Sequence, residues 1–127
     1  MDPITGKCHC GKNSFVLSAD PEFQFICYCH NCQLLNSGGH LCGMLFDKNC
    51  LEEARATQTY TYKGGSGNSI ILHFCPECST QLYAYPIEYP NKVVIRANTL
   101  DNEGFKPQQA LFAESSFSWD KPVSMEE

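Results

Sequence analysis

Cys27-Tyr28-Cys29-His30-Asn31-Cys32 is the stretch on which the fold and the chemistry of this 127-residue chain depend. It places three thiols within six residues, so all three can reach one small, soft cation. Zinc prefers four ligands in tetrahedral geometry, and this local triplet supplies only three. Either a fourth ligand comes from elsewhere in the chain, or the fourth position is left open for water or a substrate.

The other cysteines help to decide between these two cases. The chain has nine cysteines, and four of them form two further close pairs, Cys8-His9-Cys10 and Cys75-Pro76-Glu77-Cys78. A Cys-x-x-Cys pair is typical of one half of a zinc site and needs two more thiols. Cys8 and Cys10 are the natural partners of Cys75 and Cys78, because the two pairs together supply the four thiolate ligands of a closed site. The sequence therefore predicts two Zn²⁺ per chain, in one closed structural site and one open site at Cys27, Cys29 and Cys32.

A disulfide framework is the alternative explanation for so many cysteines. The segment Met1-Asp2-Pro3 opens the sequence without the apolar run of a secretion signal. Cysteines two residues apart are too constrained to pair with each other, and nine thiols leave one over. We therefore expect reduced, metal-bound cysteines and a cytoplasmic location.

Composition narrows the function further. The formal net charge of −5 leaves no basic surface for a phosphate backbone, so we expect no nucleic-acid binding. No apolar run approaches the length of a membrane span, so we expect no membrane association. The length suits a single domain covering residues 1–127.

Residue patterning predicts a mainly β domain of seven or eight short antiparallel strands, stapled by zinc. Runs of β-branched and aromatic residues, bounded by Gly, Pro and Asn turns, indicate these strands. Gly64-Gly65-Ser66-Gly67-Asn68 predicts a hairpin turn. Only two helical pieces are expected, a single turn at residues 33–36 and a short helix at residues 49–56, which Asn49 would cap. The strands are expected at residues 13–19, 23–26, 40–47, 57–63, 69–74, 81–85, 92–97 and 110–113.

An open site with three thiolates favours sulfur chemistry. Three thiolates and Zn²⁺ sum to a net charge of −1, so this metal should acidify water less well than a histidine-bound zinc. It should still hold another soft sulfur well. The pattern therefore indicates the making or breaking of a bond to sulfur rather than hydrolysis.

The order of these motifs resembles the glutathione-dependent formaldehyde-activating enzyme family, also called the centromere-protein-V-like group. The resemblance implies a β-tent fold, a structural zinc on the two outer cysteine pairs and a catalytic zinc on the triplet. It also implies carbon–sulfur lyase activity with glutathione as co-substrate, acting on a small-molecule thiol or thioether adduct. The matching segments span nearly the whole chain: residues 6–11, residues 27–32, Phe74-Cys75-Pro76-Glu77-Cys78, Thr99-Leu100-Asp101 and Trp119-Asp120.

The chain departs from the family pattern beside both cysteine groups. Tyr28 stands where the family usually has His, and Ser79 stands where it usually has Gly. His30, inside the triplet, is the candidate catalytic acid or base, although a solvent-facing loop residue is the simpler interpretation. Cys42 is expected to pack as a small hydrophobe, and it would be the best candidate for a fourth thiolate at the triplet.

Two other classes of function compete with the enzyme hypothesis. A non-catalytic zinc-binding interaction module of the same β-tent fold would need only the four-thiolate site, and the extra triplet argues against it. A methionine sulfoxide reductase would need a reactive free cysteine, and Cys42 and Cys50 lack the surrounding motif of that family.

Overall fold

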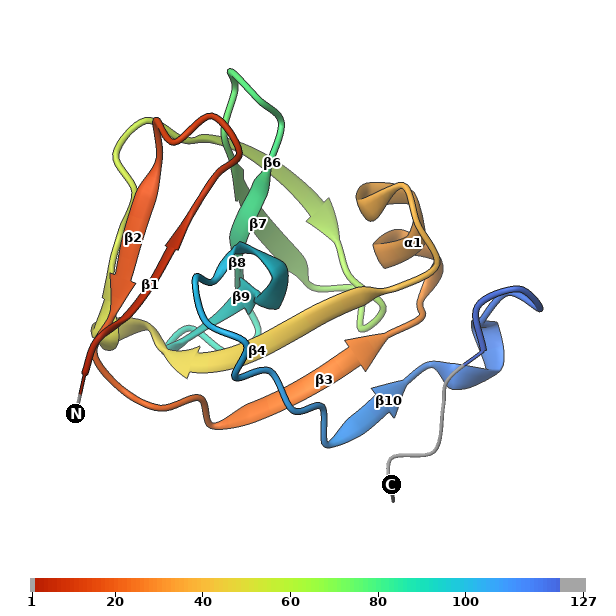
Figure 1. Cartoon of the computed structure of the whole chain (residues 1–127). Coiled ribbons are helices and arrows are strands. Elements are labelled where there is room, and N and C mark those ends of the chain that lie inside the picture. Colours follow the sequence, from red (N-terminus) through yellow and green to blue (C-terminus); the bar gives the residue numbers. More distant parts are fainter. Residues whose placement is uncertain (1, 122–127) are drawn as a thin grey trace.

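The computed structural model describes residues 2–121, and within them ten strands form two sheets. Figure 1 shows the smaller sheet on one side of the molecule and helix α1 on the other. No helix in this range is long and apolar enough to cross a membrane. The strands are β1 (Ile4–Lys7), β2 (Ser14–Leu17), β3 (Phe23–Cys27), β4 (Leu41–Asp47), β5 (Leu51–Glu52), β6 (Gln58–Lys63), β7 (Ser69–Phe74), β8 (Gln81–Pro86), β9 (Lys92–Arg96) and β10 (Gln109–Leu111). The helices are α1 (His30–Asn36) and the 3-10 turns η1 (Lys48–Cys50), η2 (Ala97–Thr99) and η3 (Ala113–Ser115).

The large sheet has the strand order β10-β3-β4-β9-β8-β7-β6, and the small sheet has the order β1-β2-β5. All neighbouring pairs are antiparallel except β10 and β3, which run parallel. Figure 1 shows the large sheet curling from β3 and β4 round to β6 and β7. One face of this curled sheet is turned toward the small sheet, and the other face is turned away from it.

The hydrophobic core lies between the small sheet and one face of the large sheet. Successive strand residues point to opposite faces, and β9 shows the result. Val93 and Ile95 are fully buried in the core, whereas Arg96 belongs to the other face. Phe15 of β2 meets Tyr83 of β8 edge to face, with ring centroids 5.6 Å apart. Each large apolar side chain buried in this way contributes about 1.5–3 kcal/mol.

The prediction of a mainly β, β-tent fold built from short strands is confirmed, with three corrections. The helix predicted at residues 49–56 is wrong. Asp47 caps the short turn η1 by accepting from the backbone N–H of Asn49, and the chain then pairs with β2 through Leu51 and Glu52. Strands β1 and β5 were not expected, and the β10–β3 pair is parallel rather than antiparallel. Pairing with distant strands overrides the weak local signals in these segments.

Gly43 of β4 should be intolerant of a side chain. A methyl group there would lie 2.5 Å from Cζ of Phe25, whose ring covers this position from the neighbouring strand. We expect Gly43→Ala to lower the free energy of unfolding by about 1–3 kcal/mol, the usual cost of overpacking. Urea unfolding measures this, and Gly104→Ala is the control because its loop position meets only ordinary contacts. Equal stability of the two variants would contradict the close packing of Phe25 on Gly43.

Candidate metal centres and substrate cavity

Four cysteines from two distant turns bring their sulfur atoms together. Cys8 and Cys10 follow β1, and Cys75 and Cys78 lie in the turn between β7 and β8. Their Sγ atoms all lie within 4.8 Å of one another. The Sγ atoms of Cys8 and Cys10 are 3.6 Å apart, and those of Cys10 and Cys75 are 3.8 Å apart. Tetrahedral bonds of about 2.3 Å place thiolate sulfurs about 3.8 Å apart, so this cluster fits a metal ion.

Hydrogen bonds reach two of the sulfur atoms in this cluster. The backbone N–H of Asn13 donates to Cys8 Sγ at 3.3 Å, and Thr80 Oγ1 lies 3.3 Å from Cys78 Sγ. The contact with Thr80 is the main reason that the pKa of Cys78 is lowered, to about 5. Ser79 has a φ of 71°, in the left-handed region that glycine tolerates best. A glycine, which the family pattern usually has at this position, would relieve that strain.

The triplet forms a second, entirely local cluster at the junction of β3 and α1. Cys27 ends β3, Cys29 is the N-cap of α1, and Cys32 lies in its first turn. Their Sγ atoms also lie within 4.8 Å of one another. The backbone N–H of Cys32 donates to Cys29 Sγ at 3.4 Å, and hydrogen bonds from Cys27 and Cys32 lower the pKa of Cys29 to about 2. Hydrogen bonding with Cys29 raises the pKa of Cys27 to about 11, and hydrogen bonding with Cys27 raises the pKa of Cys32. Without a metal the cluster therefore favours one thiolate, at Cys29, and its three sulfurs lie within reach of one soft cation.

The sulfur spacing of the triplet is tighter than a bound metal requires. The Sγ atoms of Cys29 and Cys32 are 3.2 Å apart, so they would separate by roughly half an ångström to reach tetrahedral spacing. Both side chains lie on a helix terminus, where a small rotation is sufficient. All nine cysteines are free thiols, so no disulfide competes for these sulfurs.

The triplet lines a cavity of about 580 Å³ on the face of the large sheet turned away from the core. Alternate residues of successive strands form its floor, and the segment that joins β6 to β7 contributes to its wall. Most of the lining is aromatic or aliphatic, as in sites that exclude water from a small ligand. The lining residues are Phe23, Phe25, Cys27, Cys29, Asn31, Cys32, Leu41, Leu45, Tyr62, Gly64, Gly65, Ser66, Ile70, Ala84, Pro86, Glu88, Tyr89, Lys92, Val94, Arg96, Leu111 and Phe112.

Two polar side chains on the sheet floor face the triplet. Burial is the largest cause of the raised pKa of Tyr62, and Cys32 and Cys29 raise it further, so its hydroxyl stays protonated at neutral pH. Arg96 is only 3% exposed, and its Nη2 atom is buried without a hydrogen-bond partner. Neither residue lies near the triplet in sequence, and only strand pairing brings them to it.

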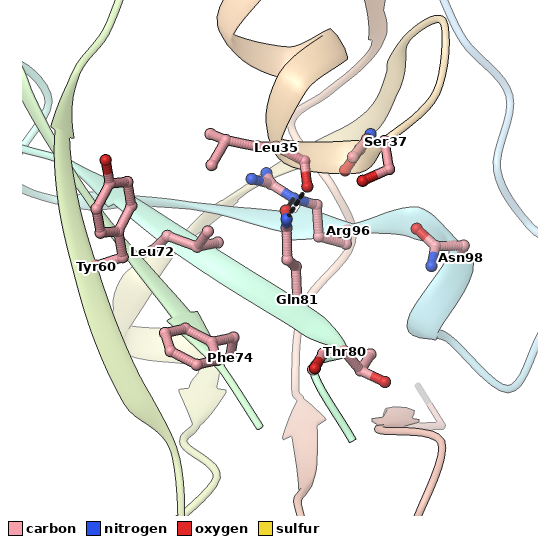
Figure 2. Close-up of a pocket in the computed structure, with 11 residues that line it drawn as sticks. Leu35, Ser37, Tyr60, Leu72, Phe74, Thr80, Gln81, Arg96 and Asn98 are labelled. Atoms are coloured by element: carbon pink, nitrogen blue, oxygen red, sulfur yellow. Dashed lines mark hydrogen bonds between the residues drawn. The ribbon is translucent and has the colours of Figure 1, made fainter. Parts of the chain in front are cut away.

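A second cavity, of about 620 Å³, adjoins the first beyond Arg96, which lines both. Figure 2 shows Gln81 reaching from β8 toward Arg96 and toward the end of α1. Gln81 Nε2 donates to the Leu35 carbonyl at 2.5 Å, and Arg96 Nε donates to Gln81 Oε1 at 3.4 Å. The lining residues of this second cavity are Leu35, Asn36, Ser37, Tyr60, Leu72, Phe74, Ser79, Thr80, Gln81, Arg96 and Asn98.

Comparison with known proteins agrees with this geometry. The sequence profile described as "Glutathione-dependent formaldehyde-activating enzyme" matches residues 3–115. The chain belongs to the glutathione-dependent formaldehyde-activating enzyme family. A Halomonas elongata protein named "Putative glutathione-dependent formaldehyde-activating enzyme" is 28% identical over 131 aligned positions, which cover 98% of this chain and 83% of the relative. The crystal structure of a Rhodobacter sphaeroides protein covers 84% of this chain and 98% of its own at a TM-score of 0.62, and its 17% identity supports the shared fold alone.

The resemblance to the glutathione-dependent formaldehyde-activating family is thus confirmed, and the structure locates the other residues considered from the sequence. His30 is exposed at the start of α1 and is absent from the linings of both cavities, so its catalytic role stays a prediction. Cys42 lies outside both thiol clusters. Arg96 was not expected, although a lone arginine ending the apolar run Val93-Val94-Ile95 is the signal that could have identified it.

The two clusters should differ in their effect on stability. Cys10 and Cys75 are 65 residues apart, whereas the triplet closes no long loop. Because metal binding energy at such a long-range site is folding energy, we expect Cys75→Ser to lower the melting temperature by roughly 10 °C or more. Cys29→Ser should lower it by less than about 4 °C. Thermal melts followed by circular dichroism measure both changes, and equal losses would show that the division between the clusters is wrong.

Proposed function

We propose that this protein is a zinc-dependent carbon–sulfur lyase that uses the triplet site to make or break a bond between a thiol and a small electrophile. Glutathione is the proposed thiol, because the family and the Halomonas elongata relative carry glutathione in their names. We propose a reducing, cytoplasmic location, which is compatible with nine free cysteines.

The observation that carries this proposal is the difference in what surrounds the two clusters. The triplet opens onto a cavity of about 580 Å³, a size typical of small-ligand sites. The four-cysteine cluster lines neither of the two cavities, and two of its members, Cys8 and Cys75, are buried in the core cluster. A metal held by four thiols has its coordination filled and a structural role, whereas three thiols beside a cavity leave room for a ligand.

The donor set favours zinc at both clusters, because thiolate sulfur is a preferred ligand of this ion. Cys8, Cys10, Cys75 and Cys78 would hold the structural ion, and Cys27, Cys29 and Cys32 would hold the catalytic one. When bound at the triplet, zinc supplies stabilisation of a further sulfur as its thiolate.

The rest of the reaction depends on the protein side chains. In the direction of addition, the thiol loses its proton, its sulfur bonds to a carbonyl carbon, and the carbonyl oxygen takes up a proton. Elimination is the reverse. The aromatic rings of Phe23, Phe25 and Phe112 line the cavity and exclude water. Tyr62 keeps its proton at neutral pH and can donate a hydrogen bond to that oxygen.

Metal content is the first test of the proposal. Protein purified without chelator should contain two zinc ions per chain by elemental analysis, because both clusters bring enough sulfurs within reach of one ion. Cys29→Ser should reduce the content to about one ion. A wild-type content of one ion that cannot be raised by added zinc would remove the basis for chemistry at the triplet.

Thiol binding is the second test. Reduced glutathione should bind with micromolar to millimolar affinity, which corresponds to roughly 4–8 kcal/mol. Calorimetry should show weaker binding of S-methylglutathione, because the ether sulfur cannot become a thiolate. Cys29→Ser should largely erase the difference between the two ligands.

Equal binding of both ligands to the wild-type protein would mean that the triplet does not hold the sulfur. Binding of neither ligand, in protein that retains two zinc ions, would favour a non-catalytic zinc-binding module instead.

A further inference from the structure

Arg96 is a buried cation that forms no ion pair within residues 2–121. Arg96 is 3% exposed, its Nη2 atom has no hydrogen-bond partner, and its Nε atom donates to the neutral amide of Gln81 at 3.4 Å. The three ion pairs in this range belong to Lys12, His40 and Lys92. A buried charge without a counter-charge is costly, so an anion is missing from the surroundings of Arg96.

The triplet is the group that can supply this anion. Arg96 lines the same cavity as Tyr62 and the three cysteines of the triplet, and Tyr62, Cys32 and Cys27 raise the pKa of Arg96 against the larger effect of burial. Burial lowers the pKa of Arg96, yet a guanidinium stays charged at neutral pH. Tyr62 is neutral there because its own pKa is raised. The cysteines of the triplet, which line the same cavity as Arg96, can carry the compensating negative charge when they are ionised.

The position of Arg96 is tied to the helix that carries the triplet. Gln81 accepts from Arg96 with one amide atom and donates to the Leu35 carbonyl, near the end of α1, with the other. Arg96 also stands on β9 opposite Gly43 of β4, a position that the ring of Phe25 covers. The guanidinium is therefore held in place before any ligand arrives, which is the condition for efficient electrostatic stabilisation.

We propose that Arg96 is the counter-charge of the triplet site and makes the site selective for an anionic sulfur ligand. This inference rests on the proposed function of the triplet. Three thiolates and a divalent ion carry a net charge of −1, and a substrate thiolate would raise it to −2. The fixed charge of Arg96 offsets one unit in a site of low dielectric constant, where such an interaction is strong. Arg96 acts on the ligand through this charge, so it is a positioning residue rather than a catalytic one.

A stability cycle tests the counter-charge directly, without an activity assay. Arg96→Met is made in the wild-type protein and in Cys29→Ser, which disables the triplet and keeps the four-cysteine cluster. In the wild type, Arg96→Met should lower the melting temperature by about 4 °C, because it leaves the charge of the loaded triplet uncompensated. In Cys29→Ser it should be neutral or stabilising, because it removes a buried charge that has lost its partner. The same change in both backgrounds would overturn the proposal.

Ligand binding provides the second measurement. Arg96→Met should weaken the binding of reduced glutathione at least tenfold, equivalent to about 1.4 kcal/mol, and should change the binding of S-methylglutathione by less than threefold. Arg96→Lys should restore part of the loss because it keeps the charge. Arg55→Met is the matched control, since it removes an exposed arginine that lines neither cavity.

The outcomes separate this inference from the function on which it rests. Suppose that the wild type holds zinc at the triplet and binds glutathione. If Arg96→Met then leaves glutathione binding unchanged and shifts the melting temperature equally in the wild type and in Cys29→Ser, the counter-charge proposal is wrong and the proposed function stands. An equal loss of affinity for reduced glutathione and S-methylglutathione would indicate that Arg96 contacts the glutathione backbone directly. That result would also overturn the counter-charge proposal. If the wild type holds no metal at the triplet, the proposed function itself fails.

Discussion

The convergence of four thiols at the turn between β7 and β8 is the constraint on which the rest of the structure depends. It brings the segment after β1 against the large sheet, where one metal ion would tie the two sheets together. Cys8 and Cys75 belong to the same core cluster as Phe15 and Tyr83. The sulfur cluster and the hydrophobic core therefore reinforce each other, and a domain of this modest size benefits from such a staple.

With one face of the large sheet occupied by this core, the other face is free for function. The period of two along each strand assigns every second residue to the cavity side. The end of β3 then delivers the triplet to the margin of that cavity, where the start of α1 supplies backbone N–H groups to the sulfurs. Gly43 contributes by leaving space into which the ring of Phe25 fits. The site is thus a consequence of strand order rather than of any one loop.

The cavity side carries one residue that hydrophobic packing does not explain. An arginine buried beside three thiols would be unfavourable in a purely structural sheet, because its charge would lack a partner. In a site that holds negative charge, the same residue becomes useful. Arg96 lines both cavities, and Gln81 connects it to the end of α1.

The sequence by itself determined the two cysteine groups, the family and most of the strands. These features are local: close spacing of Cys27, Cys29 and Cys32 restricts what they can bind, and runs of β-branched and aromatic residues favour strands wherever they pair. The helix expected at residues 49–56 failed because pairing of Leu51 and Glu52 with β2 is a long-range contact, invisible to local signals. Only the tertiary structure decided which face of each strand became core, where the cavity lies, and that Tyr62 and Arg96 face the triplet while His30 faces solvent. Those outcomes depend on the order and register of strands distant in sequence, since the curled sheet, and no single segment, brings these side chains together.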